Sequence, residues 1–66
     1  MSAILTVVRQ DGEMFYHRRG KLYSCWSNPN WREHATHFKT VKHAVRVARK
    51  KYVMGYEYRS WLASAI

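Results

Sequence analysis

Residues 37–52, HFKTVKHAVRVARKKY, carry half of the twelve Lys and Arg side chains of the chain. At about 100° per residue in an α-helix, Lys42, Arg46, Arg49 and Lys50 fall within an arc of roughly 100°. No acidic residue lies in this segment, so no ion pair along the helix relieves the positive charge. Lys and Arg on such a face suit contacts with nucleic-acid phosphates, which position a protein without reading base sequence. A solvated helix back and a phosphate-contacting face both remain open.

A second basic cluster lies in the segment YHRRGKLY, residues 16–23, around the turn signal Gly20. A basic hairpin tip can contact a phosphate backbone, and an exposed tyrosine beside it can stack on an unpaired base. Alternatively, the tyrosines pack against the helix, while the charges keep the hairpin soluble and its edge unpaired. The candidates in this cluster are Arg18, Arg19 and Lys21 for phosphate contacts and Tyr16 and Tyr23 for a partner surface.

The three tryptophans differ in their sequence surroundings. In so small a domain we expect Trp26 and Trp61 to fill the core, since each indole buries a large area. Trp31 lies between Asn30 and Arg32 in a polar connection, so we expect it to be the exception. Trp31 and Arg32 are therefore predicted to belong to a partner surface.

Residue types that support catalysis or metal binding are sparse. A closed zinc site needs four suitable ligands, usually with a close cysteine pair, and this chain has the single cysteine Cys25. Cys25 lies in a strand-like segment, which favours a small core residue over a nucleophile. The four acidic residues show no pairing that suits two-carboxylate chemistry. We therefore predict no enzyme activity, no metal site and no cofactor.

The charge balance gives a formal net charge of +8 at neutral pH. Such a charge attracts polyanions, which include nucleic acid, anionic membranes and acidic protein surfaces. No apolar run approaches the roughly 20 residues of a membrane span. The N-terminal MSAILTVV lacks the basic start of a signal peptide. A lone thiol fits a reducing compartment. The sequence thus predicts a cytoplasmic protein with no membrane partner.

A chain of 66 residues supplies one domain, residues 1–66, to position these side chains. Residues 3–10, 13–19 and 21–26 have the apolar, β-branched or alternating character of strands. Asp11 and Gly12 form a strong hairpin signal between the first two, because both turn positions favour positive φ. Alternation places Met14, Tyr16 and Arg18 on one face of the second strand and Phe15, His17 and Arg19 on the other.

The second half of the chain contains the predicted helix. Residues 27–35, which include Pro29, are expected to form one long connection. Thr40 is the predicted N-cap of a helix over about 41–52. Residues 56–61 are predicted to form a last strand or an extended tail. The predicted fold is α+β, a small antiparallel sheet of three to four strands packed by one amphipathic helix in β-β-β-α-β order. The inner stripe of the helix is predicted to be Val41, Ala44, Val45, Ala48 and Tyr52.

Residues 38–48 have the form F-x-T-x-x-x-A-x-x-x-A and follow strand-like segments that carry an Asp-Gly turn and a tryptophan. This pattern resembles short proteins encoded by bacteriophages and prophages. The resemblance covers most of the chain. It implies a small sheet packed by one helix and no particular activity. The matching positions are Asp11, Gly12, Trp26, Phe38, Thr40, Ala44 and Ala48.

The same junction is similar to the three-strand-plus-helix DNA-binding domains of some integrases and of plant ethylene-response factors. In those domains the sheet reads the major groove and the helix packs behind it. Phe38, Thr40 and Ala44 match their strand-to-helix junction. The chain departs from them at Lys42 and His43, where those domains carry acidic residues. Since a fold does not fix a function, this similarity alone implies none.

Two functions from different classes are consistent with the sequence. The first is a small basic accessory protein of phage or mobile-element origin that binds DNA or RNA through phosphate contacts. The second is an interaction protein whose basic face docks on an acidic surface of a host enzyme or defence complex and so modulates or inhibits that partner. A phage origin would place either one in the host bacterial cytoplasm. A free sheet edge would also allow the chain to pair into a homodimer.

Overall fold

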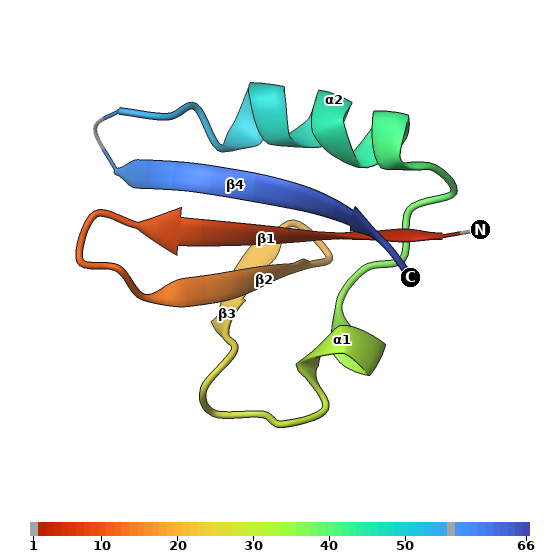
Figure 1. Cartoon of the computed structure of the whole chain (residues 1–66), viewed down its shortest axis with the longest axis horizontal. Helices are drawn as coiled ribbons and strands as arrows, with labels where there is room; N and C mark the ends of the chain where they lie inside the picture. Colours follow the sequence, from red (N-terminus) through yellow and green to blue (C-terminus); the bar gives the residue numbers. More distant parts are fainter. Residues whose placement is uncertain (1, 56) are drawn as a thin grey trace.

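The computed structural model describes residues 2–55 and 57–66, and it confirms the predicted α+β fold (Figure 1). One four-stranded antiparallel sheet, in the order β3-β2-β1-β4, is covered on one face by the main helix. The elements are β1 (Ala3–Arg9), β2 (Met14–Arg18), β3 (Lys21–Ser24), α1 (Trp31–His34), α2 (Val41–Lys51) and β4 (Tyr58–Ala65).

The C-terminal strand β4 is longer than the sequence predicts. It pairs with β1 along the whole of that strand, from Ala3 opposite Ala65 to Arg9 opposite Tyr58. The predicted segment 56–61 begins at Tyr56, which lies outside the described residues. The small residues near the C-terminus have little strand preference of their own, so pairing with β1 is what makes them a strand.

The two hairpin turns differ from the prediction. In the β1–β2 turn, Gly12 has a positive φ of 89°, as predicted, but Asp11 does not have a positive φ. Among the described residues other than glycine, only Arg19 has one. The Asp11 carboxylate instead accepts a hydrogen bond from the Glu13 amide at 2.9 Å. The two-residue turn with positive φ at both positions lies between β2 and β3, at Arg19 (φ 50°) and Gly20 (φ 80°). This turn presents a cationic side chain at its tip.

Helix α2 packs closely on the sheet through small residues. Ala44 and Ala48 are fully buried against Leu5 and Val7 of β1. The Thr40 side chain caps the helix by accepting a hydrogen bond from the His43 amide at 3.1 Å, as predicted. The predicted inner stripe is confirmed for three residues. These are Ala44, Ala48 and Tyr52; of the other two predicted residues, Val45 is partly buried and Val41 is exposed. Val47, which was not predicted to face inward, packs against the core.

The segment between the two helices crosses from one face of the sheet to the other. It lies between the start of β1 and the end of β2. The Thr36 amide donates to the His17 carbonyl at 2.9 Å, and Ala3 and Phe38 exchange backbone hydrogen bonds. Short helix α1, which was predicted as part of a loop, therefore covers the face opposite α2. There Trp31 and Ala35 pack near Ile4, Tyr16 and Cys25.

A buried polar pair fastens the end of α2 to the sheet. His17 Nδ1 and the Tyr52 hydroxyl lie 2.6 Å apart, and both side chains are buried. Burial lowers the pKa of His17 below its usual 6.5, and the nearby Lys51 charge adds to the effect. Burial raises the pKa of Tyr52 to about 12, with a smaller contribution from Tyr58. The folded protein therefore favours both groups in their neutral forms.

We expect stability to decline at both ends of the pH range. Below about pH 6.5 the unfolded chain takes up a proton at His17 that the folded state resists, so the unfolding free energy falls with falling pH. Above about pH 10 the unfolded chain loses the Tyr52 proton first, so the unfolding free energy falls with rising pH. Urea unfolding across pH measures both effects.

The matched control for the acid limb is an exposed histidine. His17→Gln should flatten the acid limb of the stability profile, whereas His34→Gln should leave its slope unchanged, because His34 is exposed. An acid limb that stays equally steep in His17→Gln would contradict the assignment.

Candidate functional site

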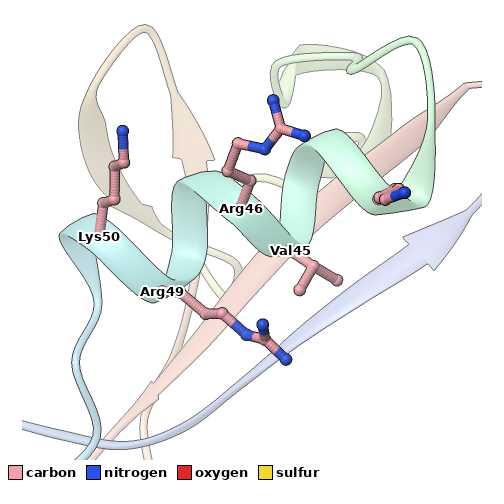
Figure 2. A pocket seen from close by; sticks show the side chains of 5 residues that line it. Val45, Arg46, Arg49 and Lys50 are labelled. Atoms are coloured by element: carbon pink, nitrogen blue, oxygen red, sulfur yellow. The ribbon is translucent and has the colours of Figure 1, made fainter.

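The outward face of α2 carries a cluster of exposed cations. Lys42, Arg46, Arg49 and Lys50 are exposed and, with the partly buried Val45, line a shallow open depression. Figure 2 shows Arg46 and Lys50 extending from one side of α2, and Val45 and Arg49 from the side on which β4 passes. We call the four cationic residues the helix cationic face. The predicted helical residues therefore do lie together.

Only some of the cations on this face stabilise the helix electrostatically. Cations in the last turn, which include Arg49 and Lys50, interact favourably with the helix dipole by about 0.3–1 kcal/mol each. Lys42 lies in the first turn, where the dipole disfavours a cation, and Arg46 lies mid-helix. Like charges four residues apart, as in Lys42–Arg46 and Arg46–Lys50, cost about 0.2–0.5 kcal/mol per pair. The helix fold alone therefore does not favour Lys42 and Arg46.

No carboxylate of the described sequence belongs to α2. The acidic residues lie in the β1–β2 turn, in α1 and just before β4. The positive potential over the helix cationic face is thus not balanced from within the helix. The four acidic residues are Asp11, Glu13, Glu33 and Glu57.

The hairpin cations occupy a different surface from the helix cationic face. Arg18 pairs with Lys21 at the end of the β2–β3 ladder. Alternation along β2 places Arg18 on the same face as the buried Tyr16, which is the face opposite α2. Of the seven predicted phosphate-contacting residues, Arg18 and Lys21 thus lie on the face opposite α2, Arg19 lies in the turn between them, and the four helical residues lie on the α2 side.

The two groups meet at one point, the β2–β3 turn. The Lys51 ammonium Nζ donates a hydrogen bond to the Gly20 carbonyl at 2.9 Å. The exposed Arg19 precedes Gly20 at the tip of this turn. Sequence reasoning did not include Lys51 among the site residues, because its helical angle lies at the margin of the basic face. Its position follows only from the packing of the hairpin against the end of α2.

Three aromatic rings stack on the face opposite α2. Tyr16 lies between Tyr23 and Trp31, with ring centroids 5.7 Å and 6.0 Å away. Tyr16 is 4% exposed, so the prediction that it belongs to a partner surface is wrong, since its neighbours cover it. Tyr23 is 44% exposed. Trp31 is partly buried, and the Arg32 guanidinium lies 5.3 Å from its ring centroid.

Trp26, which was predicted to lie in the core, is the most exposed aromatic side chain of those described, at 82%. It follows the end of β3 by two residues, where strand alternation no longer sets the direction of side chains. No feature of its sequence neighbourhood indicates this exposure. Trp26 is therefore more accessible to a partner than Trp31, for which the partner surface was predicted.

The single cysteine of the chain is poorly placed to act as a nucleophile. Cys25 is buried, and burial raises the pKa of its thiol, which disfavours the reactive thiolate. Within residues 2–55 and 57–66, no group of three or more His, Cys, Asp or Glu side chains could hold a metal ion. In the same ranges, no helix has the length and apolar character needed to cross a membrane.

Comparisons with known proteins return no significant match. Neither the protein-family models, nor the curated proteins, nor the solved structures match this chain. The resemblances drawn from the sequence therefore stay predictions.

Proposed function

We propose that this protein binds nucleic acid through the phosphate backbone, with the helix cationic face as its main contact. The observation that carries the proposal is the exposure of four cations on one face of a helix that contains no acid. Two of them are electrostatically unfavourable within the helix, because Lys42 lies in the first turn and Arg46 has a like charge four residues away on either side. A phosphate backbone would relieve the repulsion that these charges cause.

The scaffold suits this role because the helix is held firmly. Ala44 and Ala48 bring α2 close to the sheet, and the His17–Tyr52 pair fixes its end. The 11-residue helix is about 16 Å long. Duplex DNA carries one charge for about every 1.7 Å of its axis, so the face can contact several phosphates at once.

The contacts proposed here carry no base specificity. Lys and Arg on phosphates position a protein without reading sequence, and nothing in the proposal requires DNA over RNA. A role as an accessory protein of a phage or mobile element is implied by the sequence resemblance and stays a prediction.

The test is direct binding at low salt. We expect the protein to bind a fluorescently labelled duplex DNA at about 50 mM salt, measured by anisotropy, because the charge contacts are least screened there. Polyglutamate of equal charge serves as the control polyanion. Absence of binding to DNA and RNA at low salt would overturn the proposal.

A second candidate function is docking on a protein. A groove beside α1 is lined by Trp31, Arg32 and mainly apolar side chains of the sheet, which include Leu62, a residue that is 62% exposed. Together with the exposed Trp26, this surface favours a protein contact. If polyglutamate binds as tightly as DNA, the basic face fits an acidic protein surface better than a nucleic acid.

A further inference from the structure

The exposed ring of Tyr23 is presented as a stacking surface. Tyr16 covers one face of this ring, with an interplanar angle of 27°. Strand β3 lies at the edge of the sheet, and Tyr23 remains 44% exposed. Nearly half of Tyr23 is therefore accessible to a ligand although Tyr16 stacks on its ring. Tyr16 in turn stacks on Trp31, so Tyr23 is supported by a packed aromatic cluster.

Cationic side chains flank this ring on the same face. In the β2–β3 ladder, Tyr16 pairs with Tyr23, and the next pair on that face is Arg18 with Lys21. Lys21 is exposed and Arg18 is partly buried. Successive pairs on one face are two residues apart along a strand, which is roughly 7 Å. A ring that can take a base thus has cations within reach of the adjoining phosphate.

A short path of positive charge connects this surface to the helix cationic face. It runs from Lys21 around the tip at Arg19 to Lys51, whose ammonium contacts the turn at Gly20. In Figure 2 the β2–β3 hairpin lies on the Lys50 side of α2, in agreement with that contact. A polymer that follows this path must bend around the tip of the β2–β3 hairpin. Duplex DNA, with a persistence length of about 150 base pairs, resists such a bend, whereas a single strand does not.

We infer that the outer face of the β2–β3 hairpin binds single-stranded nucleic acid, with an unpaired base stacked on Tyr23 and its phosphate held by Lys21 and Arg18. This inference rests on the proposed function and names the ligand class. Aromatic platforms beside a basic groove bind single strands with little sequence preference, because every base has a face to stack. The helix cationic face holds either form of nucleic acid, and the hairpin adds contacts that a duplex does not reach.

The test compares three nucleic-acid probes of equal length, which are an oligothymidylate, the same strand with abasic sites throughout, and a duplex. Polyglutamate is again the control polyanion. Wild-type protein should bind the oligothymidylate more tightly than the abasic strand, since both carry the same phosphates. Tyr23→Leu should weaken oligothymidylate binding at least about fivefold and leave the duplex and abasic affinities unchanged. Tyr23→Phe keeps the ring and should retain full affinity.

The outcomes separate this inference from the proposed function. Unchanged duplex binding by Tyr23→Leu shows that the variant is folded. If wild type binds the abasic strand as tightly as the oligothymidylate, or if Tyr23→Leu weakens all three probes equally, the inference fails while phosphate binding stands. If polyglutamate binding falls in Tyr23→Leu as much as oligothymidylate binding, the surface takes acidic peptide and the inference is overturned. If none of the probes binds, both proposals fail.

Discussion

Leu5→Ala is expected to lower the unfolding free energy by about 2–5 kcal/mol. Leu5 is fully buried at the centre of the sheet, where α2 packs through Ala44 and Ala48. These alanines have no longer side chain that could fill the cavity, so little of the loss is recovered. A domain of this size has a total stability of roughly 3–10 kcal/mol, so the variant should be largely unfolded well below the wild-type melting temperature. Urea unfolding measures the change.

Leu62→Ala is the matched control for this prediction. It makes the same substitution on β4, at a side chain that is 62% exposed, and should change the unfolding free energy by about 0.5 kcal/mol or less. If the two variants are equally stable, the core does not lie between α2 and β1 as described.

Replacement of the whole helix cationic face by glutamine is expected to weaken duplex binding strongly without unfolding the protein. Affinity at low salt should fall at least about 100-fold, because four phosphate contacts are lost. Stability should change by about 1 kcal/mol or less, because relief of like-charge repulsion opposes the loss of dipole interactions. Glutamine keeps a good helix propensity. Anisotropy and urea unfolding on the same samples measure both. The variant combines Lys42→Gln, Arg46→Gln, Arg49→Gln and Lys50→Gln.

The control removes the same charge from other exposed positions. Both variants have a net charge of about +4, so a face-specific contact predicts that only the helix variant loses affinity. Equal losses would mean that net charge alone governs binding, which contradicts the assigned site. The control variant combines Arg9→Gln, Arg32→Gln, Lys39→Gln and Arg59→Gln, all exposed residues.

Periodicity in the sequence predicted the two faces of β2 and three of the five inward-facing residues assigned to the helix. The two-residue alternation placed Tyr16 and Arg18 opposite His17, and the structure confirms it, since Tyr16 packs near Cys25 and His17 reaches Tyr52. The helix limits and the Thr40 cap follow from local signals that α2 preserves. These features can be predicted from sequence because they depend on residues that are close together in the chain: the apolar side chains of one helix face, and the side chain that accepts a hydrogen bond from the first helical amides.

Features set by contacts between distant segments were not predictable. The strand pairing that extends β4 to Ala65 depends on β1, and the passage of residues 36–38 between β1 and β2 depends on hydrogen bonds to Ala3 and His17. That passage puts α1 on the face opposite α2, where it covers Tyr16. The exposure of Trp26 arises in a turn with no periodicity to read. Aromatic candidates were therefore harder to assign than the helical cations.

The division of the basic residues into two groups also needed the structure. From sequence, Arg18 and Arg46 are both cationic candidates, and neither has a signal that says which face of the sheet it joins. The register of β2 with β3 and the position of α2 decide this. The contact of Lys51 with Gly20 then defines where the two groups meet.

The salt dependence of duplex affinity tests the central claim most directly. If all four residues of the helix cationic face contact phosphates, a plot of log affinity against log salt concentration should have a slope of about −3.6. Affinity should then fall roughly 100-fold between about 50 and 200 mM salt, and the glutamine variant of the face should have a slope near zero. A wild-type slope near zero, or one that the glutamine variant shares, would contradict phosphate binding by α2.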